Sequence, residues 1–266
     1  MPAARSPVPI PILLYHAVTD RPGPDLAAWS VTPARFRERL DCLRDLGRTP
    51  LTVSGFAAAI TGDRELPERP VVSFDDGYAD FVRAAEEMAA RGVVSTLYVT
   101  TGPLVGSPTV AMPSAPMLTA EQLAPLEALG VKIGAHSHHH IDVAPRSVAL
   151  DEIRRPKAIL EDLLGHPVAS YAYPHGSYRV AVCQQVRAAG YTSACAVRNA
   201  FSSVADDPIS LARLTVRGFT TTGTVREWLQ GRGAPIARDR ELLRTKVWRV
   251  RRWAAAGAAR QQARGR

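Results

Sequence analysis

The sequence predicts an α/β protein with a single main domain, in which a parallel sheet curls into a distorted (β/α)7-type barrel. Three observations lead to this fold class. Apolar runs of strand length alternate with helical patterns along most of the chain. No convincing linker interrupts this alternation before residue 232. A chain of 266 residues can bury a full core without disulfides.

The first half of the chain contains three predicted strands. They are residues 10–15, 71–74 and 93–100. Thr32 and Pro33 suit an N-cap followed by proline at the first helical position, so a helix is expected from there until Gly47 ends it. A second helix is predicted over 78–90, with Gly92 just past its end.

The second half follows a loop rich in Gly, Pro and Ser at 102–116, whose length indicates function or disorder rather than a simple connection. The predicted strands here are 131–135, 169–172, 194–197 and 214–216. The predicted helices are 119–129, 147–164, 178–189 and 224–229. Pro156 should kink or interrupt the helix at 147–164, because proline lacks an amide hydrogen. We therefore expect one catalytic domain over residues 1–232.

The net charge of +8 belongs to the end of the chain. Residues 236–266 contain ten Lys and Arg and two acidic residues, and the rest of the chain has 23 of each sign. This balance argues against a nucleic-acid-binding domain. The cysteines, Cys42, Cys183 and Cys195, are scattered and odd in number, so we expect reduced core residues.

Residues 233–266 are expected to form a basic C-terminal helix and tail. On a helix, Leu243, Val247, Val250 and Ala254 would form an apolar stripe among basic residues and tryptophans. This helix could lie on an anionic membrane surface or pack on the barrel through its stripe. No convincing signal peptide or membrane span is present. We expect a cytoplasmic protein, either free or peripheral at the inner membrane face.

Two adjacent carboxylates, Asp75 and Asp76, follow the predicted strand at 71–74 in the motif SFDDG. Ligands bind at the carboxyl ends of strands in parallel α/β folds. Adjacent carboxylates repel each other unless a cation is near, so one could hold a metal while the other takes a proton. Asp-Asp-Gly is also ordinary turn chemistry, which is the competing interpretation.

Four of the seven histidines lie in the motif HSHHH, directly after the predicted strand at 131–135. His136 and His140 are four residues apart, so a helical turn would place both rings on one face. Two imidazoles and a carboxylate are typical of an open divalent metal site. His138 and His139 would point away from that face. The competing interpretation of each single histidine is a hydrogen-bonded structural residue.

A third motif, AYPHG, follows the predicted strand at 169–172. Its aromatic, Pro and Gly residues suit a loop that lines a substrate site, with Tyr173 and His175 as the candidates. A backbone N–H in this loop could face a developing oxyanion. An ordinary turn is the competing interpretation.

SFDDG, HSHHH and AYPHG, in this order and spacing, resemble the motifs of the polysaccharide deacetylase family, also called NodB-type carbohydrate esterases. The similarity spans residues 10–219. It implies a distorted barrel with a divalent metal, most often zinc, in its mouth, and removal of N-acetyl groups from an N-acetylglucosamine-type sugar. It also implies roles: Asp75 is the catalytic base, Asp76, His136 and His140 are the metal ligands, and the backbone N–H of His175 is the oxyanion donor.

The chain departs from the family pattern at two places. The arginine that usually accompanies the base is Ala172 here, and Arg213 could replace it from another strand. The family's closing histidine motif is absent from the end of the chain. Instead ILLYH near the start resembles that motif, as in circularly permuted members that act on poly-N-acetylglucosamine, which makes His16 the candidate general acid. A core histidine at a strand end is the alternative.

Two other functions stay open. One is deacylation of a small-molecule or natural-product amide, and the other is a sugar-binding relative without catalysis.

Overall fold

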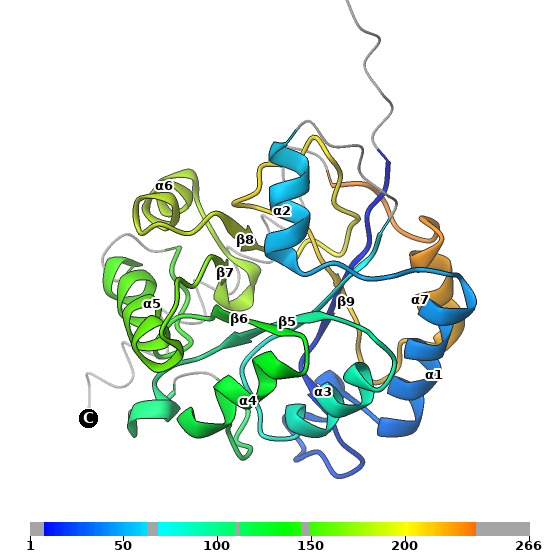
Figure 1. Cartoon of the computed structure of the whole chain (residues 1–266), viewed down its shortest axis with the longest axis horizontal. Helices are drawn as coiled ribbons and strands as arrows, with labels where there is room; N and C mark the ends of the chain where they lie inside the picture. The colour runs from blue at the N-terminus through cyan, green and yellow to red at the C-terminus, as the bar shows by residue number, and fades with distance from the viewer. Residues whose placement is uncertain (1–7, 63–68, 110–111, 145–148, 238–266) are drawn as a thin grey trace, which may run out of the picture.

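The computed structural model describes residues 8–62, 69–109, 112–144 and 149–237. Seven parallel strands form one sheet in the order β8-β7-β6-β5-β4-β1-β9, with helices packed around it (Figure 1). The segment before β9 also pairs with β8 through a bridge between Leu211 and Cys195, so the two edges of the sheet approach each other. The sheet is therefore curled into an incomplete barrel, and the predicted fold class is confirmed.

The strands of this sheet are short and buried. They are β1 (Ile12–Tyr15), β4 (Val71–Phe74), β5 (Ser95–Val99), β6 (Val131–Ala135), β7 (Ser170–Ala172), β8 (Ser193–Cys195) and β9 (Leu214–Thr215). A separate two-stranded sheet joins β2 (Ala17–Val18) to β3 (Ser30–Val31). β1 (ILLY) and β4 (VVSF) are buried throughout and have nearly continuous apolar runs, as strands covered on both faces do.

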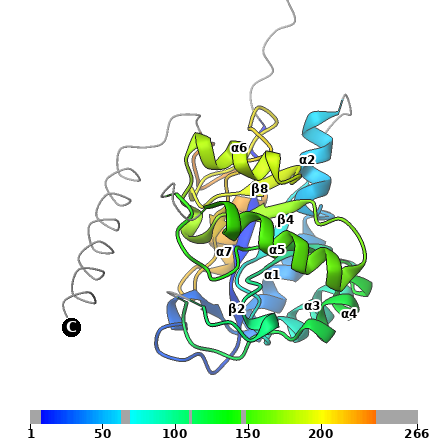
Figure 2. The same ribbon diagram turned by 90° about the vertical axis from the view of Figure 1, so that its left-hand side faces the viewer.

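Seven α-helices occur in the described residues. They are α1 (Pro33–Asp45), α2 (Val53–Thr61), α3 (Phe81–Ala89), α4 (Leu123–Ala128), α5 (Ala149–Leu164), α6 (Val180–Ala188) and α7 (Thr222–Leu229). α1 begins as predicted, with the Thr32 side chain accepting a hydrogen bond from the Arg35 amide. α5 and α6 pack on one flank of the sheet, and α1 and α7 pack together on another (Figures 1 and 2).

α5 runs unbroken through Pro156, so of the kink or interruption expected at this proline, the interruption does not occur. Proline leaves the carbonyl four residues earlier without its helical partner. Here the Tyr171 hydroxyl lies 3.5 Å from that oxygen, on Glu152, and the Tyr191 hydroxyl donates to the carbonyl of Ile153 at 3.0 Å. Side chains from the neighbouring β7 and the segment before β8 thus help to satisfy this stretch of the helix.

The position of β1 matters for the site. This strand, the first in the chain, lies between β4 and β9, with Leu13 paired to Val72 on one side and to Leu214 on the other. Residues from opposite ends of the chain are thereby brought to neighbouring strands. His16, which follows β1, comes next to the DDG motif that follows β4.

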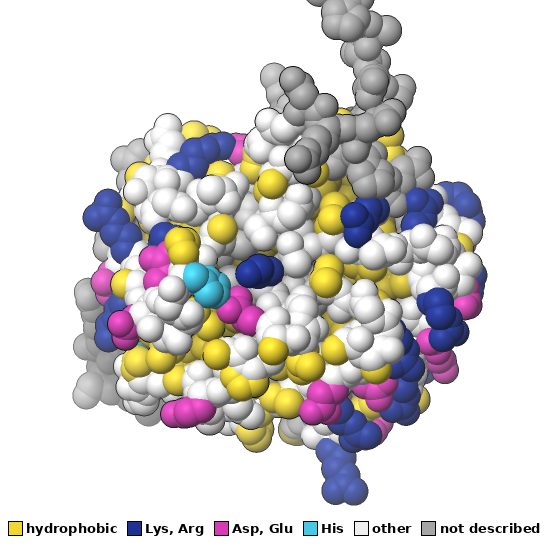
Figure 3. Space-filling view, viewed as in Figure 1, with side chains coloured by type: hydrophobic (Ala, Val, Ile, Leu, Met, Phe, Trp, Pro, Cys, Tyr) yellow, Lys and Arg dark blue, Asp and Glu magenta, His cyan; other side chains and the backbone are white. Residues whose placement is uncertain are grey.

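The described surface mixes both charge signs. On the face shown in Figure 3, basic and acidic side chains are interspersed along the rim and do not gather in one patch of a single sign. No helix among the described residues is both long and apolar enough to span a bilayer. The predicted basic helix and tail lie, from residue 238 onward, outside the described residues.

Candidate metal centre and active site

Asp76, His136 and His140 converge at the carboxyl ends of β4 and β6. Their candidate ligand atoms all lie within 4.8 Å of one another. Asp76 Oδ1 is 3.4 Å from Nε2 of each histidine, and all three residues are buried. The structure thus brings together the three residues that the sequence predicts as metal ligands, and the donor set suits an open divalent site.

The hydrogen bonds around these residues test whether a cation fits. His136 Nδ1 lies 2.9 Å from the Ala172 carbonyl, to which it donates, so its Nε2 presents a lone pair to Asp76. Asp76 Oδ1 is buried without a hydrogen-bond partner in the described part of the chain. Two buried acceptors that face each other are unfavourable unless a proton or a metal lies between them. The three residues therefore fit a divalent metal.

The charges in this cluster shift the pKa of each group. Burial lowers the pKa of His136, but the charges of Asp75 and Asp76 outweigh burial and the net shift is upward. Burial lowers the pKa of His140 to about 4. Burial acts to raise the pKa of Asp76, yet the nearby histidines hold it well below its usual range. A cation at this point would favour the deprotonated form of all three ligands.

The HSHHH loop is shaped by backbone turns and by one buried glutamate. Glu152 Oε2 accepts hydrogen bonds from the backbone N–H of His138 at 2.8 Å and of His139 at 2.9 Å. Its Oε1 lies 2.6 Å from His139 Nδ1. Ser137 and His140 have φ values of 61° and 59°, so the loop is not the helical turn that the spacing predicts. His136 and His140 still face one point, because the loop turns back on itself.

Glu152 is a functional candidate that sequence reasoning missed. It lies in the first turn of α5 and is buried, and both of its carboxylate oxygens have hydrogen-bond partners in the HSHHH loop. The side chains of His138 and His139 point away from the metal ligands, as predicted: His138 Nδ1 lies 2.8 Å from Thr101 Oγ1, and His139 Nδ1 lies 2.6 Å from Glu152 Oε1. The only signal in the sequence is an acidic residue near a helix start, which is common on helices without any such role.

Asp75 lies beside the metal ligands and is paired with Arg213. Arg213 Nη1 is 2.6 Å from Asp75 Oδ1, and Nη2 is 2.7 Å from Oδ2. Burial acts to raise the pKa of Asp75, but Arg213 and His136 outweigh it and the net shift is downward. Arg213 is itself buried, donates from Nε to the Ala196 carbonyl at 3.1 Å, and lies over the Tyr98 ring. Asp75 is therefore held ionised and oriented.

His16 follows β1 and lies near both aspartates, because Tyr15 is paired with Phe74 on the neighbouring β4. Burial lowers its pKa, although the charges of Asp76 and Asp75 act in the opposite direction. Its Nδ1 is buried without a hydrogen-bond partner in the described residues. Its ring centroid lies 5.0 Å from that of Trp29. A half-buried imidazole with an unused nitrogen, next to two carboxylates, is available for proton transfer.

The AYPHG loop places its two candidate residues differently. The His175 ring lies 4.6 Å from the His140 ring, and His175 has a φ of 61°. Tyr173 is fully buried, and its hydroxyl donates to the Ile209 carbonyl at 2.8 Å. Its prediction as a substrate-lining residue is wrong for the side chain, because the ring packs in the core against Tyr171 and Tyr178.

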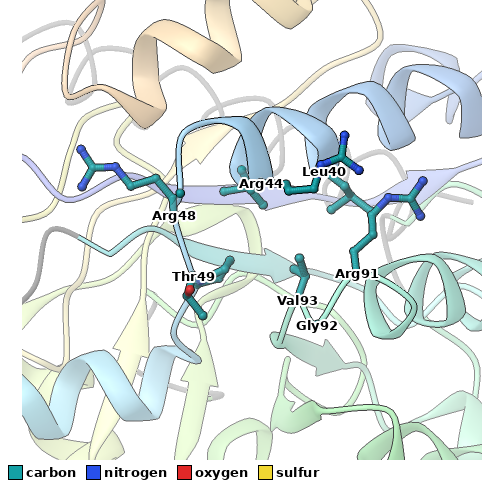
Figure 4. A pocket seen from close by; sticks show the side chains of 10 residues that line it. Leu40, Arg44, Arg48, Thr49, Arg91, Gly92 and Val93 are labelled. Carbon is teal, nitrogen blue, oxygen red and sulfur yellow. The ribbon is translucent and has the colours of Figure 1, made fainter.

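A surface pocket of about 250 Å³ lies away from this site. The end of α1, the residues just after it and the residues that precede β5 line it, so it lies near the amino end of β5 rather than at the carboxyl ends of the strands. Arg48 and Arg91 lie on opposite sides of the pocket in Figure 4, and Arg44 and Arg91 both contact Asp41. Arg91 bonds Asp41 and Glu87. The pocket therefore does not resemble a second reaction centre.

The known proteins that this chain is similar to agree with the family that the three motifs resemble. Residues 64–194 match the family model described as polysaccharide deacetylase. The Streptococcus pyogenes deacetylase PplD, solved with acetate, is 24% identical with a TM-score of 0.75, covering 84% of this chain and 99% of that chain. IcaB from Ammonifex degensii is 21% identical with a TM-score of 0.71, and the match covers 84% of this chain and 97% of IcaB. No curated protein matches the sequence.

These structural likenesses show a shared fold over most of the chain. The family match is narrower, but it includes Asp75, Asp76 and the histidines of HSHHH and AYPHG, whereas His16 and Arg213 lie outside it. The resemblance drawn from the three motifs is confirmed, because residues 64–194, which contain them, match the polysaccharide deacetylase family model.

Proposed function

We propose that this chain is a metal-dependent hydrolase that removes the acetyl group from an N-acetylated amino sugar of N-acetylglucosamine type and releases acetate. The observation that carries the proposal is the position of Asp75. It is an ionised carboxylate held by Arg213, and its Oδ2 lies 3.7 Å from Nε2 of His136, one of the three metal-ligand candidates. A base next to a metal site is the arrangement that hydrolysis of an amide needs.

Asp76, His136 and His140 would hold the metal, and zinc is our first choice because it accepts nitrogen and oxygen ligands with open positions left for water and substrate. A divalent metal bound there supplies Lewis-acid chemistry, which lowers the pKa of a water molecule and polarises the acetyl carbonyl. The Nδ1–H of His136 bonded to the Ala172 carbonyl fixes the ring so that Nε2 faces the site.

The chain's own groups would move the protons. Asp75 takes a proton from the attacking water, and its pairing with Arg213 keeps it ionised at neutral pH before that step. His16, which lies near both aspartates, delivers a proton to the nitrogen that leaves as the amine. We assign the backbone N–H of His175 to the oxyanion from the family resemblance, with its ring contact to His140 as support.

The test is acetate release measured with free, nucleotide-linked, lipid-linked and oligomeric N-acetylglucosamine, and with a simple acetanilide as a small amide. Asp75→Asn should keep its metal content and lose acetate release, whereas His136→Ala should lose the metal. Asp207→Asn, the same chemical change at an exposed ion pair with Arg187, should behave like the wild type.

Two results would contradict the proposal. Near-normal turnover by Asp75→Asn would remove the assigned base. Metal binding without acetate release from any of the sugars would leave a sugar-binding relative, and release from acetanilide alone would favour the small-amide function.

A further inference from the structure

An arginine and two aromatic rings form a surface that the proposed reaction does not use. We call Trp29, Arg217 and Phe219 the aromatic–arginine face. The guanidinium carbon of Arg217 lies 4.2 Å from the centroid of the Trp29 ring and 5.9 Å from that of Phe219. Trp29 ends the short 3-10 helix η1 (Ala27–Trp29), and the other two residues follow β9. Phe219 is 73% exposed, which is unusual for a phenylalanine and leaves its ring available to a ligand.

His16 connects this face to the metal centre. Its ring packs against Trp29 at 5.0 Å, and it lies within electrostatic reach of Asp75 and Asp76. A sugar whose acetamido group reaches the metal ligands would therefore extend past His16 toward Trp29. The aromatic–arginine face is placed to contact a neighbouring part of the same substrate.

The face is held in place by its backbone. The Gly218 amide donates to the Ala28 carbonyl at 3.3 Å, and the Gly218 carbonyl accepts from Arg35 Nη1 at 2.8 Å. A Cβ on Gly218 would lie 2.9 Å from the Ser30 carbonyl oxygen, so only glycine allows the two segments to approach this closely. The Arg217 amide donates to Thr220 Oγ1 at 2.9 Å. This arrangement exists before any ligand binds, which reduces the entropy cost of binding.

The charge of Arg217 is not neutralised within the described residues. No carboxylate there lies within ion-pair distance of its guanidinium, whereas Arg37, Arg91, Arg187 and Arg226 each contact one. A guanidinium stacked on aromatic rings keeps its N–H groups along its edges, where they match the paired oxygens of a phosphate or a carboxylate. A half-buried cation with free donors is a better site for an anion than for a neutral hydroxyl group.

We propose that the aromatic–arginine face binds an anionic group of the substrate, a phosphate or a carboxylate, attached close to the N-acetylated sugar ring. This inference rests on the proposed function and narrows its substrate class to negatively charged amino-sugar compounds. Arg217 supplies the charge-assisted hydrogen bonds, and Trp29 and Phe219 hold the guanidinium and contact the sugar ring.

The test uses the full chain, loaded with zinc and carrying Asp75→Asn so that ligands bind without turnover. Calorimetric titrations compare N-acetylglucosamine, N-acetylglucosamine 1-phosphate and N-acetylmuramic acid. At least one of the two anionic probes should bind about tenfold more tightly than the neutral sugar, and the preferred probe identifies the anionic group. Adding Arg217→Gln should remove this preference, so that the anionic probes bind no more tightly than the neutral sugar. Adding Arg226→Gln instead, at an exposed arginine paired with Asp45, should keep the preference.

Equal affinity for neutral and anionic probes would overturn the inference. A preference for the anionic probes that survives Arg217→Gln would also overturn it, because the anionic group would then bind elsewhere, for example directly to the metal. Acetate release by the wild-type chain separates the two proposals. If neutral sugars are deacetylated but anionic probes are not preferred, only the inference about Arg217 fails. If no sugar is deacetylated, the proposed function fails.

Discussion

Arg213 and Asp75 form a bidentate ion pair although they are 138 positions apart in the chain. Both side chains are buried, so neither can exchange its partner for water. A buried ion pair offsets its desolvation cost only when its geometry is good and its remaining donors are satisfied. Here Arg213 Nε also bonds the Ala196 carbonyl, so the pair is well bonded while it keeps a carboxylate ionised beside the metal ligands.

Arg213→Met should destabilise the protein and change its pH dependence. Asp75 would be left buried without its partner, which costs about 3 kcal/mol of unfolding free energy. Burial would then dominate and the pKa of Asp75 would rise, since Arg213 is the main group that lowers it. The acidic limb of the profile of kcat/KM against pH should move to higher pH. Urea unfolding and pH–rate measurements test the two effects separately.

The matched control for this change is Arg187→Met, at an exposed arginine paired with Asp207. Exposed ion pairs contribute little to stability, about 1 kcal/mol or less. An acidic limb that stays in place in Arg213→Met would show that Asp75 is not the base.

Metal binding should release a proton, because the neighbouring aspartates raise the pKa of His136 above its usual value despite its burial. A raised histidine pKa stabilises the metal-free fold at low pH, and this contribution is lost as the pH rises through the folded-state value. A metal at His136 replaces that proton. The rise in Tm caused by zinc should therefore be larger at about pH 8 than at about pH 6.

Thermal unfolding with and without zinc measures this effect across the pH range. His136→Gln should abolish the zinc-dependent rise, and His166→Gln should retain it, since His166 pairs with Glu127 away from the metal ligands. A zinc effect of the same size at every pH would count against His136 as a ligand.

Glu152→Gln should weaken metal binding although Glu152 does not contact the metal ligands. The carboxylate accepts three hydrogen bonds from His138 and His139, and an amide would present its NH2 group to donors. The loop that aims His136 and His140 would loosen, and zinc affinity should fall roughly tenfold to hundredfold. Asp162→Asn, an exposed change on the same helix, is the control. Unchanged zinc affinity in Glu152→Gln would mean that the loop holds its shape without this carboxylate.

The strands are the part of the fold that the sequence predicts best. Residues 71–74 and 131–135 match β4 and β6 in both bounds, because a short, mostly apolar run between polar turns is typical of a buried strand. The helix α2 is not predicted, since its sequence VSGFAAAIT contains small residues without a clear polar face. The strands β2 and β3 have two residues each and are too short to show any period.

A site residue can be predicted from the sequence when its residue type is rare in an ordinary turn or strand end. Four histidines within five residues, as in HSHHH, predict a metal site even when the fold is not known. The pairing of Arg213 with Asp75 could be anticipated only from the family pattern, in which an arginine is missing at Ala172. Tyr173 illustrates the opposite case, because the sequence does not show whether its ring enters the core or the mouth of the barrel.

His16→Asn tests proton delivery to the leaving group. If His16 is the general acid, loss of its imidazole should reduce acetate release from an N-acetyl sugar roughly a hundredfold or more, because the amine is a poor leaving group unless it is protonated. The nitrophenolate of 4-nitrophenyl acetate needs no proton, so hydrolysis of this ester should change much less. A purely structural role beside Trp29 would reduce both reactions by the same factor. Zinc content, measured on the same samples, should be unchanged, since the metal-ligand candidates are Asp76, His136 and His140.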